Sequence, residues 1–435
     1  MSAAVSTPLD RHHPKGFWFI FWGELAERAS FYGMASILVL YMTETLKFSD
    51  ANAATVNHLF RAAAYILPLL GGYVADRWLG KFRTIVIFAA PYILGHIILG
   101  QFSTESGLIL GLILLAGGSG AIKPNLSPLM GQMYEQQGKQ HLMSQAFAWF
   151  YTAINIGAAL TMLTLPNIRS HYGYSAAFMA PTVLMVISLA IFYAGKKYYP
   201  RETVGIVRVK TPAQREEQRA VLRRLAGVFL LIVFFWSIFD QSSSTWILFA
   251  KNYLNLDTIF GKIDPDAVQG LNPILIVVMS PLFAMYWARK DRKLGYKYPS
   301  TKKMQIGYWL VVLCMGVMAV AGYISTGYDT AGKLVSINKI TVLWEVGAYL
   351  LITMAELCLS IVGLEFAYTQ APQHMKSFLT GCFLFTVFLG NSLAAWLSRI
   401  YTEMHPGNYF LLMTVMMTVV AIVFIFVSRR FERTA

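Results

Sequence analysis

Long apolar stretches recur along the chain from residue 16 to residue 432, separated by short polar segments. A helix needs roughly 20 apolar residues to cross the hydrocarbon core of a bilayer. The pattern therefore predicts an all-α polytopic membrane protein with twelve transmembrane helices. The predicted spans are 16–41, 52–78, 83–101, 106–134, 141–166 and 172–195 in the first half, and 225–250, 272–288, 303–325, 341–368, 376–400 and 408–428 in the second half.

The widest polar gap, residues 196–224, separates these spans into two sets of six. We therefore expect an N-terminal six-helix bundle over 1–195, a basic cytoplasmic linker over 196–224, and a C-terminal six-helix bundle over 225–435. Within the linker, Thr211-Pro212-Ala213-Gln214 is typical of a capped helix start, which predicts a short surface helix there.

The composition agrees with this class of protein, because 56% of the residues are apolar and only 13% are charged. A soluble domain usually carries about 25% charged residues. Most of the 36 lysines and arginines fall in segments that face the cytoplasm if both termini lie inside. The net charge of +14 is therefore explained by topology, and no nucleic-acid partner is expected. The cysteines Cys314, Cys358 and Cys382 lie in apolar runs without the spacing of a metal site, and we expect no metal or cofactor.

Ionisable side chains inside the predicted spans are the candidate functional residues, because charge at membrane depth is costly. Carboxylates outnumber fixed cations among them, and such a surplus suits a site that carries protons. The alternative is a set of structural ion pairs that lock helices together. The residues concerned are Glu24, Glu27, Arg28, Arg61, Lys123, Asp240, Glu356 and Glu365, together with His58.

The first predicted span carries three of these charges on one helix face. Glu24, Glu27 and Arg28 stand at i, i+3 and i+4, and Tyr32 extends the face by one turn. In the fourth span, glycines at 117, 118 and 120 and the segment Lys123-Pro124 predict a break in the helix. Lys123 there suits an anionic partner, either Glu27 or a bound carboxylate. For the glycines alone, tight helix packing is an equally good explanation.

A charged motif follows the second span. Residues 72–77 (GYVADR) with 80–83 (GKFR) resemble the loop motif of the major facilitator superfamily. The resemblance implies that Asp76 and Arg77 control conformation and do not contact substrate.

Four further segments, in order along the chain, resemble motifs of the proton-coupled oligopeptide transporters. They are residues 24–32 (ELAERASFY), 147–157 (FAWFYTAINIG), 235–241 (FWSIFDQ) and 355–372 (AELCLSIVGLEFAYTQAP). The likeness covers nearly the whole chain and is greatest to the twelve-helix animal-type members. The chain lacks their large outer domain, because its loop 326–340 is a short connection.

This resemblance implies a major facilitator fold and a role for each matching residue. Glu24, Glu27 and Arg28 would couple proton movement to peptide binding, with Lys123 as their partner and His58 in proton transfer. Glu356 and Asn155 would receive the peptide's amino terminus, and Asp240 would act in conformational control. Proton coupling is assigned to Glu24, Glu27, Arg28, His58, Lys123 and Glu356, and substrate binding to Tyr32, Arg61, Tyr65, Lys123, Tyr151, Asn155, Trp236 and Glu356.

Arg61 enters the substrate group for a reason peculiar to this chain. The family pattern has an arginine seven residues beyond Arg28 that helps hold the peptide carboxylate, and this chain has Ala35 there. Arg61 shares a helix face with His58 and Tyr65, so it could supply the missing cation. The alternative is a permanent ion pair between Arg61 and Asp240 or Glu24.

The predicted function is proton-driven symport of dipeptides and tripeptides by alternating access. The expected partners are short peptides, protons and the lipid bilayer. The protein is expected to work as a monomer in the plasma or inner membrane, with both termini in the cytoplasm. The alternative within the same fold is transport of an amino acid, nitrate or a peptide-like drug. A membrane enzyme is disfavoured, because no Ser/His/Asp set, metal-ligand spacing or phosphate-binding loop occurs.

Overall fold

The structure is a computed structural model that describes residues 12–205, 211–259, 261–370 and 375–432. Long helices fill the first part of the chain, as the apolar stretches predict. They are α1 (Lys15–Glu44), α2 (Asp50–Val74), α3 (Lys81–Gln101), α4 (Glu105–Gln136) and α5 (Met143–Ala194), with short turns η1 (Ala75–Leu79), η2 (Gln140–Leu142) and η3 (Lys196–Tyr198).

The later part of the chain is also helical, with shorter helices where the predicted spans are interrupted. It contains α6 (Pro212–Phe239), η4 (Asp240–Ser243), α7 (Thr245–Tyr253), η5 (Ala267–Gly270), α8 (Leu271–Leu294), α9 (Ser300–Ser325), α10 (Leu343–Glu356), η6 (Leu357–Ile361), α11 (Val362–Thr369), α12 (Lys376–Arg399), η8 (Tyr401–Glu403) and α13 (Pro406–Glu432).

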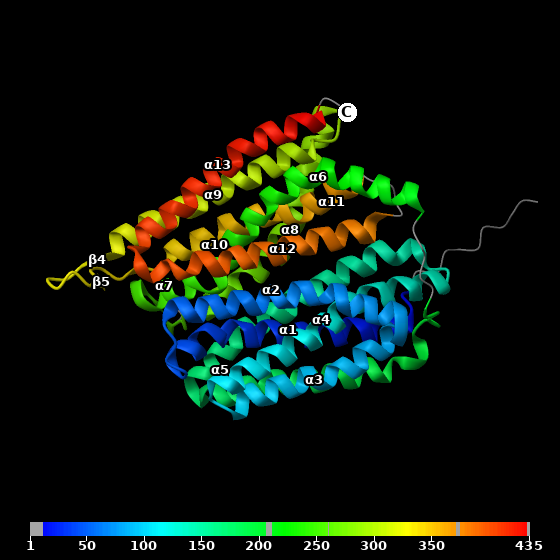
Figure 1. The fold of residues 1–435 in the computed structure, drawn as a ribbon, viewed down its shortest axis with the longest axis horizontal. Helices are drawn as coiled ribbons and strands as arrows, with labels where there is room; N and C mark the ends of the chain where they lie inside the picture. The colour runs from blue at the N-terminus through cyan, green and yellow to red at the C-terminus, as the bar shows by residue number, and fades with distance from the viewer. Residues whose placement is uncertain (1–11, 206–210, 260, 371–374, 433–435) are drawn as a thin grey trace, which may run out of the picture.

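The strands are short and belong to the loops at one end of the molecule. In Figure 1 the hairpin of β4 (Thr326–Tyr328) and β5 (Leu334–Ser336) projects from that end. β1 (Leu254–Asn255) pairs in parallel with β6 (Ile340–Thr341), and β2 (Asp257–Thr258) pairs with β3 (Gly261–Lys262). The loop 326–340 is thus a hairpin.

The all-α membrane character is confirmed, since nine helices of the described chain are long and apolar enough to cross a membrane. One of them, Gln140–Ala194, has 55 residues, more than two spans require. Its direction changes at Gly173, whose φ of 82° and ψ of 173° are not helical. The predicted fifth and sixth spans thus follow one another across this glycine. The count of twelve spans and the cytoplasmic position of the termini stay predictions.

Two local expectations need correction. The cap is present, because Thr211 and Gln214 form the reciprocal hydrogen bonds of a capping box, but no separate surface helix follows. Instead α6 continues from Pro212 into the seventh predicted span. The predicted break in the fourth span is wrong too, because α4 runs continuously through Pro124. Packing explains Gly120 there, since a Cβ would lie 2.5 Å from Cβ of Leu67.

The helices form two groups that lie side by side along their length. Figure 1 shows α1–α5 together in the lower half and α6–α13 in the upper half. α1 packs on α5 in the first group and α9 on α13 in the second, and the groups meet where α2 contacts α12 and α5 contacts α8. The exact domain boundaries at 195 and 225 stay predictions.

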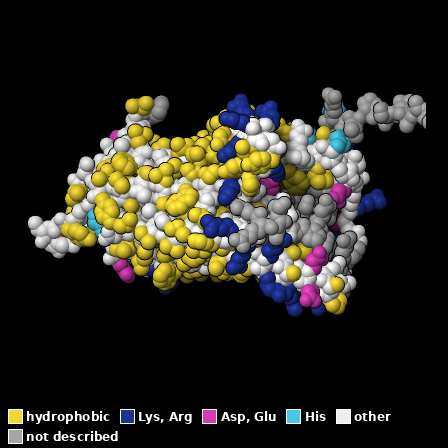
Figure 2. All heavy atoms as spheres, turned by 90° about the horizontal axis from the view of Figure 1, so that it is seen from above, with side chains coloured by type: hydrophobic (Ala, Val, Ile, Leu, Met, Phe, Trp, Pro, Cys, Tyr) yellow, Lys and Arg dark blue, Asp and Glu magenta, His cyan; other side chains and the backbone are white. Residues whose placement is uncertain are grey.

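The outer surface of the second group is apolar over most of its length. Figure 2 shows this face, with most of the lysines and arginines in view gathered towards one end. Large apolar side chains of this group, such as Leu230 on α6 and Phe426 on α13, are 59% and 60% exposed. Contiguous apolar surface of this kind suits contact with lipid.

Candidate functional site

The α1 charges form one buried cluster. Glu24, Glu27 and Arg28 are 3%, 1% and 2% exposed, respectively. Nε of Arg28 lies 3.3 Å from Oε1 of Glu24 and also contacts Oε2 of Glu27. The shared face is as predicted, and two carboxylates surround one guanidinium. Because Oε2 of Glu24 and Oε1 of Glu27 have no hydrogen-bond partner among the described residues, either carboxylate has an oxygen available for a proton.

A glycine from the second predicted motif holds this cluster against α5. A Cβ at position 157 would lie 2.5 Å from the carbonyl oxygen of Leu25. Only glycine permits that approach of α5 to the turn of α1 that carries the carboxylates.

Lys123 points its ammonium group at an aromatic ring. Its Nζ lies 3.8 Å from the centroid of Tyr65, a cation–π contact. It is close enough to Glu24, Glu27 and Asp240 to interact electrostatically, but it forms no ion pair within the described ranges. Its positive charge therefore remains available for another anion.

A polar chain joins α2 to the second half of the molecule. Nη1 of Arg61 lies 3.4 Å from Oδ1 of Asp240, and Nδ2 of Asn391 donates to Oδ2 of the same carboxylate at 2.8 Å. Nδ1 of His58 lies 3.5 Å from Oδ1 of Asn391, and its Nε2 lies 2.7 Å from Oγ of Ser244. Since Asn391 donates to Asp240, its oxygen faces His58, which then donates from Nδ1 and accepts from Ser244.

These contacts bear on two hypotheses. Arg61 adopts the alternative arrangement, an ion pair with Asp240, so its predicted role as a substrate cation stays a prediction. His58 bonds to residues of the second half and not to the Glu24 cluster, so a direct proton transfer between them has no contact in this conformation. Ala35 is completely buried, which leaves no space for an arginine at that position.

Glu356 lies at the end of α10, immediately before the π-helical turn η6. Such turns are frequent at functional sites. Nδ2 of Asn272 donates to Oε2 of Glu356 at 2.9 Å and contacts Oγ1 of Thr353 at 3.0 Å. We did not select Asn272 from the sequence, although an asparagine at the start of an apolar span was the available signal.

The predicted aromatic residues differ in their surroundings. Tyr151 and Asn155 line a cavity of about 360 Å³ between α5 and α8. Tyr32 is close enough to Arg28, Arg61 and Glu356 to interact electrostatically. Trp236 is only 8% exposed and packs against Phe383, so its place in a substrate cavity stays a prediction.

The motif after α2 includes one contact that the sequence did not indicate. Oδ1 of Asp76 accepts from Nζ of Lys81 at 3.1 Å, whereas Arg77 is exposed. Glu202, in the following linker, accepts from the backbone N–H groups of Lys81 and Phe82. The carboxylate thus caps the first turn of α3 and ties the linker to this motif.

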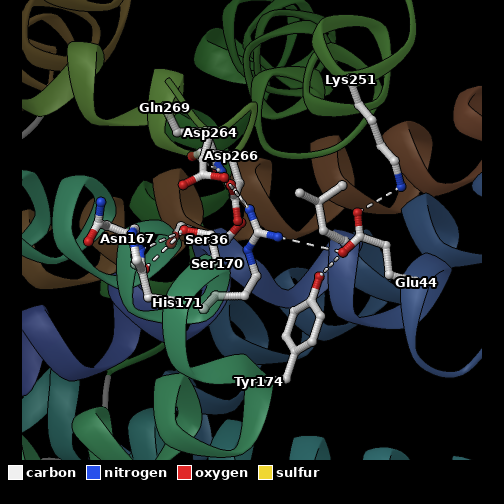
Figure 3. Close-up of polar contacts among 12 residues, drawn as sticks. Ser36, Glu44, Asn167, Ser170, His171, Tyr174, Lys251, Asp264, Asp266 and Gln269 are labelled. Atoms are coloured by element: carbon white, nitrogen blue, oxygen red, sulfur yellow. Dashed lines mark hydrogen bonds and ion pairs between the residues drawn. The ribbon is translucent and has the colours of Figure 1, made fainter. Parts of the chain in front are cut away.

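A second charged cluster joins the two groups of helices at the end predicted to be outside. Nη2 of Arg169 lies 3.0 Å from carboxylate oxygens of both Asp264 and Asp266, and its Nη1 lies 3.5 Å from Glu44. Nζ of Lys251 contacts Glu44 at 2.9 Å. Figure 3 shows Glu44, Lys251, Asp264 and Asp266 converging from α1, α7 and the loop before α8, and Arg169 on α5 links them. We call these five residues the outer ion-pair cluster.

Hydrogen bonds extend the outer ion-pair cluster. Tyr174 donates to Glu44 at 2.6 Å, and Nε2 of Gln269 donates to the carbonyl oxygen of Ser36 at 3.1 Å (Figure 3). Burial raises the pKa of Asp266 to about 7, against the opposing effect of Arg169. Burial also acts to raise the pKa of Glu44, but Tyr174 and Lys251 outweigh it and lower that pKa. At neutral pH, therefore, Glu44 is ionised and Asp266 exchanges its proton.

Glu345, in the first turn of α10, is a buried carboxylate that the sequence reasoning missed. Its Oε2 has no hydrogen-bond partner among the described residues. The signal was available, because position 345 lies inside the predicted span 341–368.

The PTR2 model of the POT family matches residues 82–205 and 201–412. The chain belongs to the POT family. Human solute carrier family 15 member 2 is 30% identical over 357 residues, which cover 71% of this chain and 49% of that protein. Human solute carrier family 15 member 1 is 31% identical over 373 residues, covering 71% of this chain and 52% of that protein. The chain thus spans about half the length of these curated relatives.

Solved structures agree over nearly the whole chain of this POT family member. The POT family transporter PepTSo has a TM-score of 0.85 and 26% identity, with 98% of this chain and 99% of that chain covered. A mutant of the peptide transporter POT in complex with alafosfalin has a TM-score of 0.86 and 25% identity, covering 98% and 97%. The predicted family and the major facilitator type of fold are therefore confirmed.

Proposed function

We propose that this protein is a proton-driven symporter of dipeptides and tripeptides that works by alternating access. The observation that carries the proposal is the placement of carboxylates within apolar helices of both halves, where Glu24 and Glu27 are buried and Glu356 is half-buried. Glu24 and Glu27 share one guanidinium on α1, whereas Glu356 on α10 accepts a hydrogen bond from the Asn272 amide of α8 and forms no ion pair within the described residues. Neutral carboxyl groups are far less costly at membrane depth than ionised ones, so each carboxylate favours binding a proton when no cation is bound.

The same residues offer a site for the two termini that every short peptide shares. Glu356, oriented by Asn272, would accept the ammonium group, with Asn155 as a second acceptor. Lys123, which lacks an ion pair within the described chain, would bind the carboxylate, with Tyr65 beneath it. Charge-assisted bonds at both ends leave the peptide side chains to roomier surroundings, which permits broad selectivity.

Alternating access would require the polar contacts that join the two halves to break and form again. The outer ion-pair cluster and the Arg61–Asp240 pair join the halves, and opening towards the outside requires the cluster to separate. A peptide between Lys123 and Glu356 would contact both halves, as a midplane ligand must. We place both termini in the cytoplasm of a plasma or inner membrane, with a single chain as the working unit and no enzymatic activity.

Uptake into sealed vesicles tests this function. Purified protein in proteoliposomes should accumulate labelled dialanine when the outside is acidic, and dipeptides and tripeptides should compete. Glu356→Gln should abolish accumulation, whereas Glu365→Gln is the matched control. Glu365 is on the neighbouring helix α11 and pairs with Lys297 at a more exposed position. Competition by nitrate or a free amino acid, without competition by peptides, would favour the alternative substrates.

A further inference from the structure

A groove runs along the membrane-facing surface where the two halves meet, and the transport site does not use it. It lies between α2, α6 and α12 and encloses about 640 Å³. Apolar side chains line it almost throughout, among them Leu69, Leu230 and Phe385, which are 43%, 59% and 41% exposed. Figure 1 shows these three helices as neighbours, with α2 from one half and α6 and α12 from the other.

Small residues keep the groove open. Ala226 on α6 and Gly381 on α12 both line it. A Cβ at position 381 would meet only Leu69, at 3.5 Å. An apolar chain could therefore lie along the groove between α6 and α12, beside Leu69 of α2, without moving their backbones.

Arginines continue the same face of α6 beyond the apolar stretch. Arg219 lies seven residues before Ala226 and Arg215 lies eleven before it, close to two and three helical turns. Arg223 lies between Arg219 and Ala226, one turn from each. The face that lines the groove therefore leads directly into a row of positive charge.

These arginines are available for an external anion. All three are exposed, and none forms an ion pair within the part of the chain that the structure describes. Nε of Arg223 lies 3.4 Å from the carbonyl oxygen of Arg219, so its guanidinium is turned back along the helix towards the Arg219 backbone. Two guanidinium groups one turn apart can contact one phosphate.

We infer that this groove binds an anionic phospholipid, with an acyl chain between α6 and α12 and the phosphate on Arg219 and Arg223. An apolar groove that leads into free arginines matches the two parts of such a lipid. Basic pockets between transmembrane helices on the cytoplasmic side bind anionic headgroups in the same way. A zwitterionic lipid would fill the groove equally well but would gain less from the arginines.

Because the groove is lined by both halves, a bound lipid would affect how the halves move relative to each other. This part of the inference rests on the proposed function. Leu69 belongs to the first half and the other lining residues named above to the second. A bound acyl chain therefore contacts both halves at once and would stabilise their present arrangement. The lipid binding itself does not depend on what the protein transports.

The binding test uses the full chain in phosphatidylcholine nanodiscs that contain a minor fraction of phosphatidylglycerol. The phosphatidylglycerol retained per protein is measured by mass spectrometry. Wild type should be enriched over the bulk ratio, and Arg219→Gln/Arg223→Gln should lower that enrichment about tenfold. Arg429→Gln/Arg430→Gln removes the same charge from the exposed end of α13 and should change it little.

A second variant tests the groove. Ala226→Phe fills the groove and keeps both arginines, so it should also lower retention. Equal losses in the two double variants would overturn the site, because they would show a general surface effect. Full retention in Ala226→Phe would also overturn it, since the acyl chain would then lie elsewhere. Thermal unfolding of each variant identifies loss through misfolding.

Discussion

Two carboxylates surround the single guanidinium of Arg28, and this ratio of charges determines how a mutation of either carboxylate should affect transport. Since Glu24 and Glu27 share one guanidinium, removing one carboxylate leaves a balanced pair that no longer needs a proton. Glu27→Gln should therefore uncouple transport, retaining peptide exchange while abolishing proton-driven accumulation. Counterflow and gradient-driven uptake of labelled dialanine, measured on the same vesicles, separate these effects. Accumulation by Glu27→Gln at the wild-type level would contradict the assignment.

His58 belongs to the polar chain that joins the halves and not to the cluster around Arg28. It bonds to Ser244 and Asn391, and Asn391 bonds to Asp240. Protonation of its Nε2 would reverse the bond to Ser244, whose hydroxyl could then donate to the carbonyl oxygen of Gln241 at 3.4 Å, and would add a second cation near Arg61. His58→Gln should flatten the pH dependence of uptake, because glutamine cannot bind that proton. A profile with the wild-type shape would show that His58 is a structural hydrogen-bonding residue.

The structure contains the helices that the apolar pattern predicts. The places where these helices are interrupted, however, depend on contacts that hydropathy does not record. The seventh span stops at Asp240, and the turn through Ser243 leaves backbone carbonyls that accept from Tyr349 and Asn57. Hydropathy does not predict this turn, because its partners Tyr349 and Asn57 are far along the chain. Ion pairing is similarly hidden in the sequence. Arg61 had two candidate carboxylates on sequence grounds, and only the fold brings Asp240 of η4 to Arg61 of α2.

The ion pair between Arg61 and Asp240 predicts non-additive mutations. Arg61→Ala leaves a buried carboxylate unpaired and should destabilise the protein by about 3–5 kcal/mol. Arg61→Ala/Asp240→Asn should recover much of that loss, as thermal unfolding in detergent would show.

The same double variant separates the two roles of Arg61. If Arg61 serves only Asp240, the double variant should bind dialanine as wild type does. Weak peptide binding with recovered stability would support the substrate role inferred from Ala35. Equal destabilisation in the single and double variants would contradict the structural pair.

At the scale of the molecule, the motifs predicted the family correctly but not the outer ion-pair cluster. Arg169 lies in α5 shortly before Gly173, and Asp264 and Asp266 lie in the loop before α8. All three fall outside the predicted spans, where charged residues are expected and were not selected. Their meeting depends on how the two halves pack. Asn272 escaped notice for a related reason, since its partner Glu356 is 84 residues away.

The outer ion-pair cluster should hold the outer end closed. Arg169→Gln removes the cation shared by three carboxylates and should shift the protein towards an outward-open form. Spin labels at Lys47→Cys and Lys262→Cys, on opposite halves, would report a longer distance. Arg399→Gln is the control, because Arg399 is exposed and pairs with none of the described residues. An unchanged distance distribution in Arg169→Gln would refute this role.

The coupling of peptide to proton movement is tested most directly when a peptide gradient, in place of a proton gradient, is the only driving force. Proteoliposomes with equal pH on both sides, a membrane potential clamped at zero and a pH-sensitive dye inside receive an inward gradient of dialanine. Symport predicts that the lumen acidifies as the peptide enters, and that Glu356→Gln abolishes both changes. Entry of labelled dialanine without acidification would contradict proton-coupled peptide transport.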